Sequence, residues 1–122
     1  WAEWSAPCRM LGPVLEHLEE QANDQWVLAK LNTELHPDIA MQYGVQGIPN
    51  VKLFVDGEIV DEFVGAMPEE MIETLLEDPI RMAKVMGQEI DHASLFEKAK
   101  ALYEMVGDAQ RAQRAAQALR GL

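Results

Sequence analysis

Two side chains near the start of the chain have the types and spacing that thiol chemistry uses. Cys8 is the only cysteine among 122 residues, and Ser5 precedes it by three positions. Thiol–disulfide exchange needs one thiolate that attacks and a second thiol that resolves the mixed disulfide, so this chain alone cannot complete that cycle. Two roles stay open for Cys8. It is either an inert, packed small side chain, or a single thiol that forms mixed disulfides or is capped when oxidised.

The residues around this pair predict a helix from about Ala6 to Gln21. Ser5 is a good N-cap whose side-chain oxygen would accept the backbone N–H of Cys8, and Pro7 fits the first helical turn. Apolar residues then recur at helical spacing at Leu11, Val14, Leu15 and Leu18. Because Pro13 lies inside this segment, we expect a kink there. The helix dipole would favour a Cys8 thiolate.

The next two segments predict a strand and a short helix. Residues 26–32 are short, mostly apolar and bounded by polar residues, which is typical of a strand buried on both faces. Residues 38–43 indicate a short helix that Gly44 closes.

A hairpin and a further helix follow. Residues 51–55 and 58–64 flank Asp56-Gly57, a strong signal for two antiparallel strands joined by a tight turn. Met67-Pro68-Glu69-Glu70 then opens a helix with proline and acidic residues in its first turn. The order of helices and strands predicts an α/β layered fold.

Composition and charge exclude several classes of partner. Three scattered histidines form no metal-ligand cluster with Cys8, and no apolar run is long enough to span a bilayer, so we expect no metal, no other cofactor and no membrane partner. The net charge of −11 argues against nucleic acid. Residues 1–78 hold sixteen acidic against three basic residues, and residues 79–122 hold five against seven. This shift marks a domain boundary near Asp78-Pro79.

Residues 79–122 predict a helical extension. Two amphipathic stretches flank a turn at Gly107-Asp108 and form an α-helical hairpin. Their apolar faces consist of Leu95, Phe96, Ala99, Leu102, Tyr103 and Val106, and of Ala109, Ala112, Ala115, Ala116 and Leu119. A single hairpin cannot bury both faces, so it should pack on the rest of the chain or pair with a second chain. Its basic residues Arg111, Arg114 and Arg120 are either ordinary surface charges or contacts to an acidic surface.

Residues 1 to about 77 resemble the thioredoxin family. The matching motifs are Trp1-Ala2-Glu3-Trp4, Pro7-Cys8-Arg9, Gly12-Pro13, Ala29-Lys30-Leu31-Asn32 and Tyr43-Gly44-Val45-Gln46-Gly47-Ile48-Pro49, in the family's order. The resemblance implies a thioredoxin fold, with a mixed sheet flanked by helices, to which the helical hairpin is added. It also implies a bacterial, cytoplasmic protein of cell redox homeostasis.

The resemblance also implies roles for individual residues. Ser5 stands where the family carries its attacking cysteine, and Cys8 occupies the resolving position. Because a serine hydroxyl is not ionised near neutral pH, two-cysteine turnover is not expected and Cys8 is at most a monothiol; an engineered Cys-to-Ser substitution would give the same sequence. Pro49 would be cis, and its loop would bind an extended polypeptide. The implied substrate-binding residues are Trp4, Ala6, Pro7, Gly47, Ile48 and Pro49.

The family's fold begins with a strand, a helix and a central strand that leads into Trp1. We therefore expect residues upstream of Trp1, or a strand from another chain, to lie beside residues 26–32. The family's buried acidic residue also lies in that upstream strand, outside this sequence.

The extension resembles one tetratricopeptide repeat through Phe96, Tyr103, Gly107-Asp108 and Ala112, with Lys100 in place of a small residue. The combination resembles bacterial thioredoxin-like co-chaperones, which bind unfolded clients. Two hypotheses follow. The first is a redox-homeostasis protein that acts on thiol-containing proteins through Cys8. The second is a non-catalytic co-chaperone, holdase or adaptor for protein clients, with a homodimer through the tail or through strand exchange as one arrangement.

Overall fold

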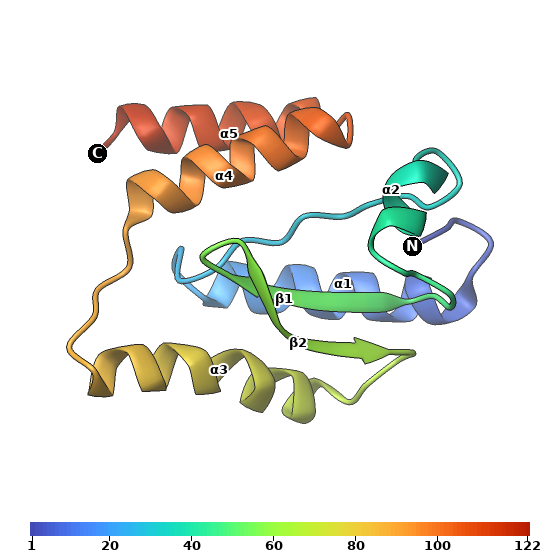
Figure 1. The fold of residues 1–122 in the computed structure, drawn as a ribbon, viewed down its shortest axis with the longest axis horizontal. Coiled ribbons are helices and arrows are strands. Elements are labelled where there is room, and N and C mark those ends of the chain that lie inside the picture. The colour runs from blue at the N-terminus through green and yellow to red at the C-terminus, as the bar shows by residue number, and fades with distance from the viewer.

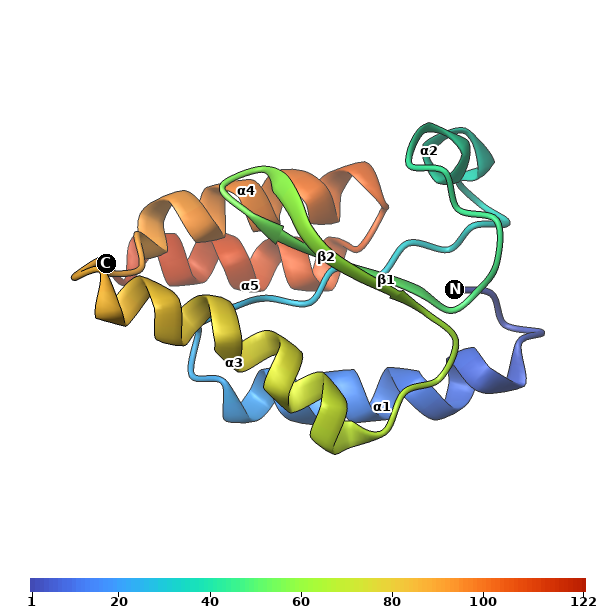
Figure 2. The ribbon, with the colours of Figure 1, turned by 60° about the horizontal axis from the view of Figure 1, so that its bottom comes forward.

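Five helices and a two-stranded antiparallel sheet make up the fold, which a computed structural model describes for residues 1–122. In chain order the elements are α1 (Ala6–Gln21), α2 (Pro37–Gln42), β1 (Asn50–Val55), β2 (Glu58–Val64), α3 (Glu69–Val85), α4 (His92–Met105) and α5 (Ala109–Arg120). Figures 1 and 2 show α1 and α3 beside the β1–β2 hairpin, and the α4–α5 pair beyond the extended segment 26–32. None of these helices combines the length and hydrophobicity that crossing a bilayer needs. We call residues 1–78 the body and the α4–α5 pair the tail hairpin.

The β1–β2 hairpin forms where the sequence predicts it. The two strands pair antiparallel from Asn50 opposite Val64 to Val55 opposite Glu58. Asp56 and Gly57 join them with φ angles of 51° and 81°. Both angles lie in the left-handed region, which glycine and, less readily, aspartate adopt in tight hairpin turns. The prediction of antiparallel neighbours is confirmed.

The larger core lies between α1, the hairpin and α3. Its buried members are Leu11, Leu18, Phe63 and Ile72, with Val51 and Trp26 among the half-buried side chains packed against them. Leu11 and Leu18 are seven positions apart on α1, so they share one helix face. This helix face fixes the side of α1 that turns inward and so places Cys8, three residues before Leu11, at the same buried side.

The predicted strand at residues 26–32 is wrong. This segment is extended, but it pairs with no strand, and side chains bind its backbone instead. The N–H of Leu28 donates to the Glu19 carboxylate. The Leu28 carbonyl accepts hydrogen bonds from the Tyr103 hydroxyl at 2.8 Å and the Arg111 guanidinium at 3.0 Å. An apolar run can be read as a strand from sequence, but a strand requires a neighbouring backbone that continues its ladder.

The two remaining body helices match the sequence closely. The short helix is α2, displaced by one residue from the predicted 38–43, and Gly44 follows it with a φ of 68°. Helix α3 begins at Glu69 after Pro68, as the Pro-Glu-Glu pattern predicts, and it continues through Pro79 to Val85. The sequence position proposed as a domain boundary therefore lies inside α3.

The tail hairpin is the predicted pair of helices. Asp91 and Asp108 cap their N-termini through side-chain hydrogen bonds to Ser94 and Arg111. Ala99, Tyr103, Ala112 and Ala115 form a small buried cluster between α4 and α5, and Val27 of the body packs against it. The tail hairpin therefore packs on the extended segment of its own chain.

Candidate functional site

Ser5 has the structural role that its position predicts. Its side chain is 4% exposed, and its Oγ accepts the backbone N–H of Cys8 at 3.2 Å. The bond satisfies one of the free N–H groups of the first helical turn, where Pro7 needs no such partner. The hydroxyl of Ser5 is thus occupied as an acceptor within its own helix.

Cys8 is a free thiol at the buried side of α1. It is 7% exposed and lies in the first helical turn. This burial limits the approach of a partner disulfide. The position supports chemistry only with a partner that reaches past the exposed Ala6 and Pro7.

The loop before β1 contains the predicted Pro49. The peptide bond between Ile48 and Pro49 is cis, and Pro49 is buried. The Pro49 carbonyl accepts the Gly65 N–H at 2.7 Å, which ties this loop to the end of β2. Gly47 is exposed, and an added Cβ there would meet Val64 at 3.6 Å, an ordinary contact. Both views place this loop and the start of α1 at the same end of the molecule (Figures 1 and 2).

Trp4 is the most exposed large side chain of the site. It is 68% exposed, and its indole N–H donates to the Glu34 carboxylate at 2.8 Å. Glu34 belongs to the turn that precedes α2, thirty residues further along the chain. This hydrogen bond restrains the indole while its apolar surface stays in solvent, which suits a side chain that contacts a partner.

The predicted site residues therefore fall into two groups. Trp4, Ala6, Pro7 and Gly47 are exposed and Ile48 is half-buried, whereas Ser5, Cys8 and Pro49 are buried. No sequence pattern indicates Glu34, whose contact with Trp4 depends on the fold. Nor does any pattern indicate the role of the Arg9 guanidinium, which donates to the Glu3 carbonyl at 2.6 Å and steadies the same loop.

Lys30 and Glu16 form an ion pair close to the Trp1 ring. The Lys30 ammonium lies 3.2 Å from the Glu16 carboxylate and 4.9 Å from the centre of the Trp1 ring. The carboxylate of Glu16 also lies 3.7 Å from Arg111 of the tail hairpin. No three His, Cys, Asp or Glu side chains are grouped so that they could hold a metal ion.

Comparison with known proteins identifies the family. A family model described as Thioredoxin matches residues 1–78. A thioredoxin of Chlorobaculum thiosulfatiphilum is 42% identical over 80 residues, which cover 66% of this chain and 74% of that protein. Thioredoxin 1 of Synechococcus elongatus is 42% identical over 77 residues, which cover 63% and 72%. A thioredoxin of Alicyclobacillus acidocaldarius is 40% identical over 81 residues, which cover 66% and 77%. With its match over residues 1–78 and the helices that flank its sheet, the chain belongs to the thioredoxin family of redox proteins.

Proposed function

We propose that this chain binds an extended segment of a thiol-containing protein between the Ser5–Cys8 loop and the Gly47–Pro49 loop. Thioredoxins act on thiol-containing proteins, and the two loops lie at the same end of the molecule (Figure 1). The observation that carries the proposal is Trp4, which is exposed on its apolar surface and restrained by Glu34. A restrained aromatic side chain loses little conformational entropy when a partner covers it.

The chemistry available at this site differs from two-cysteine exchange. A Cys8 thiolate can attack a disulfide such as oxidised glutathione, which forms one mixed disulfide and releases one glutathione thiolate. Resolution then needs a thiol from outside the chain, because the Ser5 hydroxyl is neither ionised near neutral pH nor able to form a disulfide. Cys8 therefore acts at most as a monothiol, and its 7% exposure limits how fast it reacts.

The test is reduction of insulin disulfides by dithiothreitol, measured for the unmodified chain beside Ser5→Cys and Ser5→Ala. We expect no acceleration by the unmodified chain or by Ser5→Ala, and clear acceleration by Ser5→Cys, because that substitution restores the attacking thiol. Acceleration by Ser5→Ala would refute the assignment of the defect to position 5. Silence of Ser5→Cys, with its fold intact by circular dichroism, would refute a disulfide-binding groove at these loops.

A second candidate function is a non-catalytic co-chaperone, holdase or adaptor. Exposed apolar side chains near the site favour it, because such surfaces bind varied partners. They are Trp4, Met10, Leu35 and Met41, each more than two-thirds exposed. In this proposal the tail hairpin, which resembles a tetratricopeptide hairpin, adds surface for clients.

Suppression of client aggregation tests the second function. We expect Cys8→Ala to suppress the aggregation of reduced, thermally unfolded citrate synthase as well as the unmodified chain, because holding a client needs no thiol. Trp4→Ala should suppress it less, with the exposed Met86→Ala, which lies on the C-terminal cap of α3, as the control. No suppression by a stoichiometric excess of the unmodified chain would end this proposal.

Self-association through the sheet or the tail hairpin is a further proposal. The two-stranded sheet has an outer edge on each strand, and such edges can pair with a second chain. We therefore propose a homodimer through strand exchange or through the tail hairpin. Light scattering across a concentration series tests it, and a constant monomer mass would refute it.

A further inference from the structure

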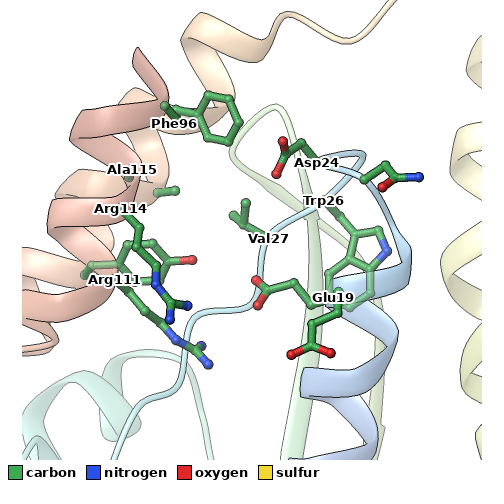
Figure 3. A pocket seen from close by; sticks show the side chains of 13 residues that line it. Glu19, Asp24, Trp26, Val27, Phe96, Arg111, Arg114 and Ala115 are labelled. Atoms are coloured by element: carbon green, nitrogen blue, oxygen red, sulfur yellow. The ribbon is translucent and has the colours of Figure 1, made fainter. Parts of the chain in front are cut away.

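A cleft of about 320 Å³ lies at the junction of the body and the tail hairpin. One wall comes from the end of α1 and the turn that follows it, and the other from α4 and α5 (Figure 3). The Ser5–Cys8 loop lies at the opposite end of α1, roughly 20 Å away at the rise of an α-helix. The cleft is therefore separate from the proposed thiol site.

The cleft combines apolar walls with charged rims. Trp26 and Val27 on the body side and Phe96 on the tail side supply apolar surface. Figure 3 shows the carboxylates of Glu19 and Asp24 on one wall and the guanidinium groups of Arg111 and Arg114 on the other. A cleft with this lining suits a ligand that is apolar along its length and charged at one point.

The charges that are free to meet a ligand are mainly negative. Arg111 is already bound, since it donates to the Leu28 carbonyl and lies within 3.7 Å of Glu16 and 3.6 Å of Asp108. Glu19 accepts the Leu28 N–H. The exposed carboxylates of Glu20 and Asp24 make no ion pair or side-chain hydrogen bond, and the single free cation that opposes them is Arg114.

We propose that this cleft binds an extended polypeptide stretch in which a lysine or arginine is flanked by apolar residues. The aliphatic stem of the basic side chain lies along Trp26 and Phe96, and its charged end meets Glu20 and Asp24. A phosphate or an acidic peptide would meet more negative than positive free charge and is disfavoured. Arg114 should lower the affinity for this peptide, because its positive charge repels the bound cation.

The test uses a fluorescein-labelled, capped hexapeptide in which one central lysine is flanked by leucines, titrated at low ionic strength and followed by fluorescence anisotropy. We expect the double variant Glu20→Gln/Asp24→Asn to bind it about fivefold more weakly than the unmodified chain, because two partly exposed ion pairs are lost. Asn also tolerates the left-handed backbone of position 24, where φ is 61°, so the fold is kept. Arg114→Ala should bind the peptide about twofold more tightly.

A matched control separates the cleft from the general acidity of the body. Glu58→Gln/Glu77→Gln removes the same charge from exposed positions outside the cleft and should leave binding nearly unchanged. Equal weakening of both double variants, or no weakening of the cleft variant, would overturn the proposal. Weaker binding by Arg114→Ala would also overturn it, because the ligand would then need a cation in the cleft.

The peptide measurement and the insulin assay test different proposals, so a negative result in one does not affect the other. Glu20 and Asp24 lie far from Cys8, so loss of peptide binding leaves the thiol proposal standing, and silence of Ser5→Cys leaves the cleft proposal standing. A second peptide with glutamine in place of the lysine completes the test. Equal affinity for both peptides would mean that binding in the cleft does not depend on the positive charge of the peptide, which contradicts the proposal.

Discussion

The body and the tail hairpin bury their residues in different ways. The body core is built from large side chains, Leu11, Leu18, Phe63 and Ile72. The tail cluster is built from three alanines around Tyr103. Large side chains stabilise a fold through the apolar area they bury, whereas small ones allow two helices to approach closely. The body should therefore be sensitive to lost volume and the tail hairpin to added volume.

The largest expected effect is loss of volume in the body core. Ile72 on α3 is 1% exposed and belongs to the same buried cluster as Leu11 and Leu18 of α1. Ile72→Ala should lower the free energy of unfolding by about 2–5 kcal/mol, because it removes buried methyl groups and leaves a cavity. Urea denaturation followed by far-ultraviolet circular dichroism measures this loss.

Met71 provides the control for that measurement. It precedes Ile72 on the same helix but is 56% exposed. Met71→Ala should change the free energy of unfolding by less than about 0.5 kcal/mol, since surface substitutions have small effects. Equal losses for the two variants would contradict the placement of the core on one face of α3.

Added volume in the tail hairpin should have the next largest effect. Ala115 is buried between α4 and α5 and near Val27 of the body. Ala115→Leu should lower the free energy of unfolding by about 1–3 kcal/mol, because overpacking pushes the helices apart. Hydrogen exchange should rise first in α4 and α5, with little change in the β1–β2 hairpin.

The control introduces leucine at Ala101, which is an exposed position of α4. Ala101→Leu should leave exchange in the tail hairpin as it is in the unmodified chain. If Ala115→Leu accelerates exchange in β1 and β2 as much as in α5, the body and the tail hairpin unfold as one unit and the contrast between them is lost.

The sequence predicts those parts of the fold and the site that are formed by residues close to one another in the chain. Ser5 caps the helix that contains Cys8, and Asp56-Gly57 forms the hairpin turn, because each arrangement depends on neighbours along the chain. The apolar pattern of residues 26–32 wrongly predicts a strand, since it carries no information about which part of the molecule will lie beside that backbone.

Long-range contacts explain the remaining differences. Glu34 restrains Trp4 across 30 positions, and Tyr103 reaches Leu28 across 75. No periodicity or motif signals such pairs, because they exist only once the elements have packed. The cleft beside Trp26 and Phe96 was invisible in the sequence for the same reason, although the acidic body and the basic residues of the extension did indicate charges that could meet.

The smallest expected effect concerns Tyr103, which attaches the tail hairpin to the body. Burial, with a further contribution from the Glu19 carboxylate, raises the pKa of Tyr103 to about 12, from 10.0. An unfolded chain would therefore lose this proton at lower pH than the folded one, so the contribution of Tyr103 to stability is fully present below pH 10 and is lost as the pH rises towards 12. Deprotonation also removes the donor that binds the Leu28 carbonyl.

Tyr103→Phe should consequently have two effects. Near neutral pH it should lower the free energy of unfolding by about 0.5–1.5 kcal/mol, or less, because Arg111 still donates to the same carbonyl. Between pH 10 and 12 it should make stability fall less steeply than in the unmodified chain, whereas Tyr43→Phe, at an exposed ring, should keep the full slope. Thermal denaturation across this range measures both effects. An unchanged slope in Tyr103→Phe would mean that this hydroxyl is open to solvent, and the attachment of the tail hairpin would then depend on other contacts, such as those of Arg111 and Val27.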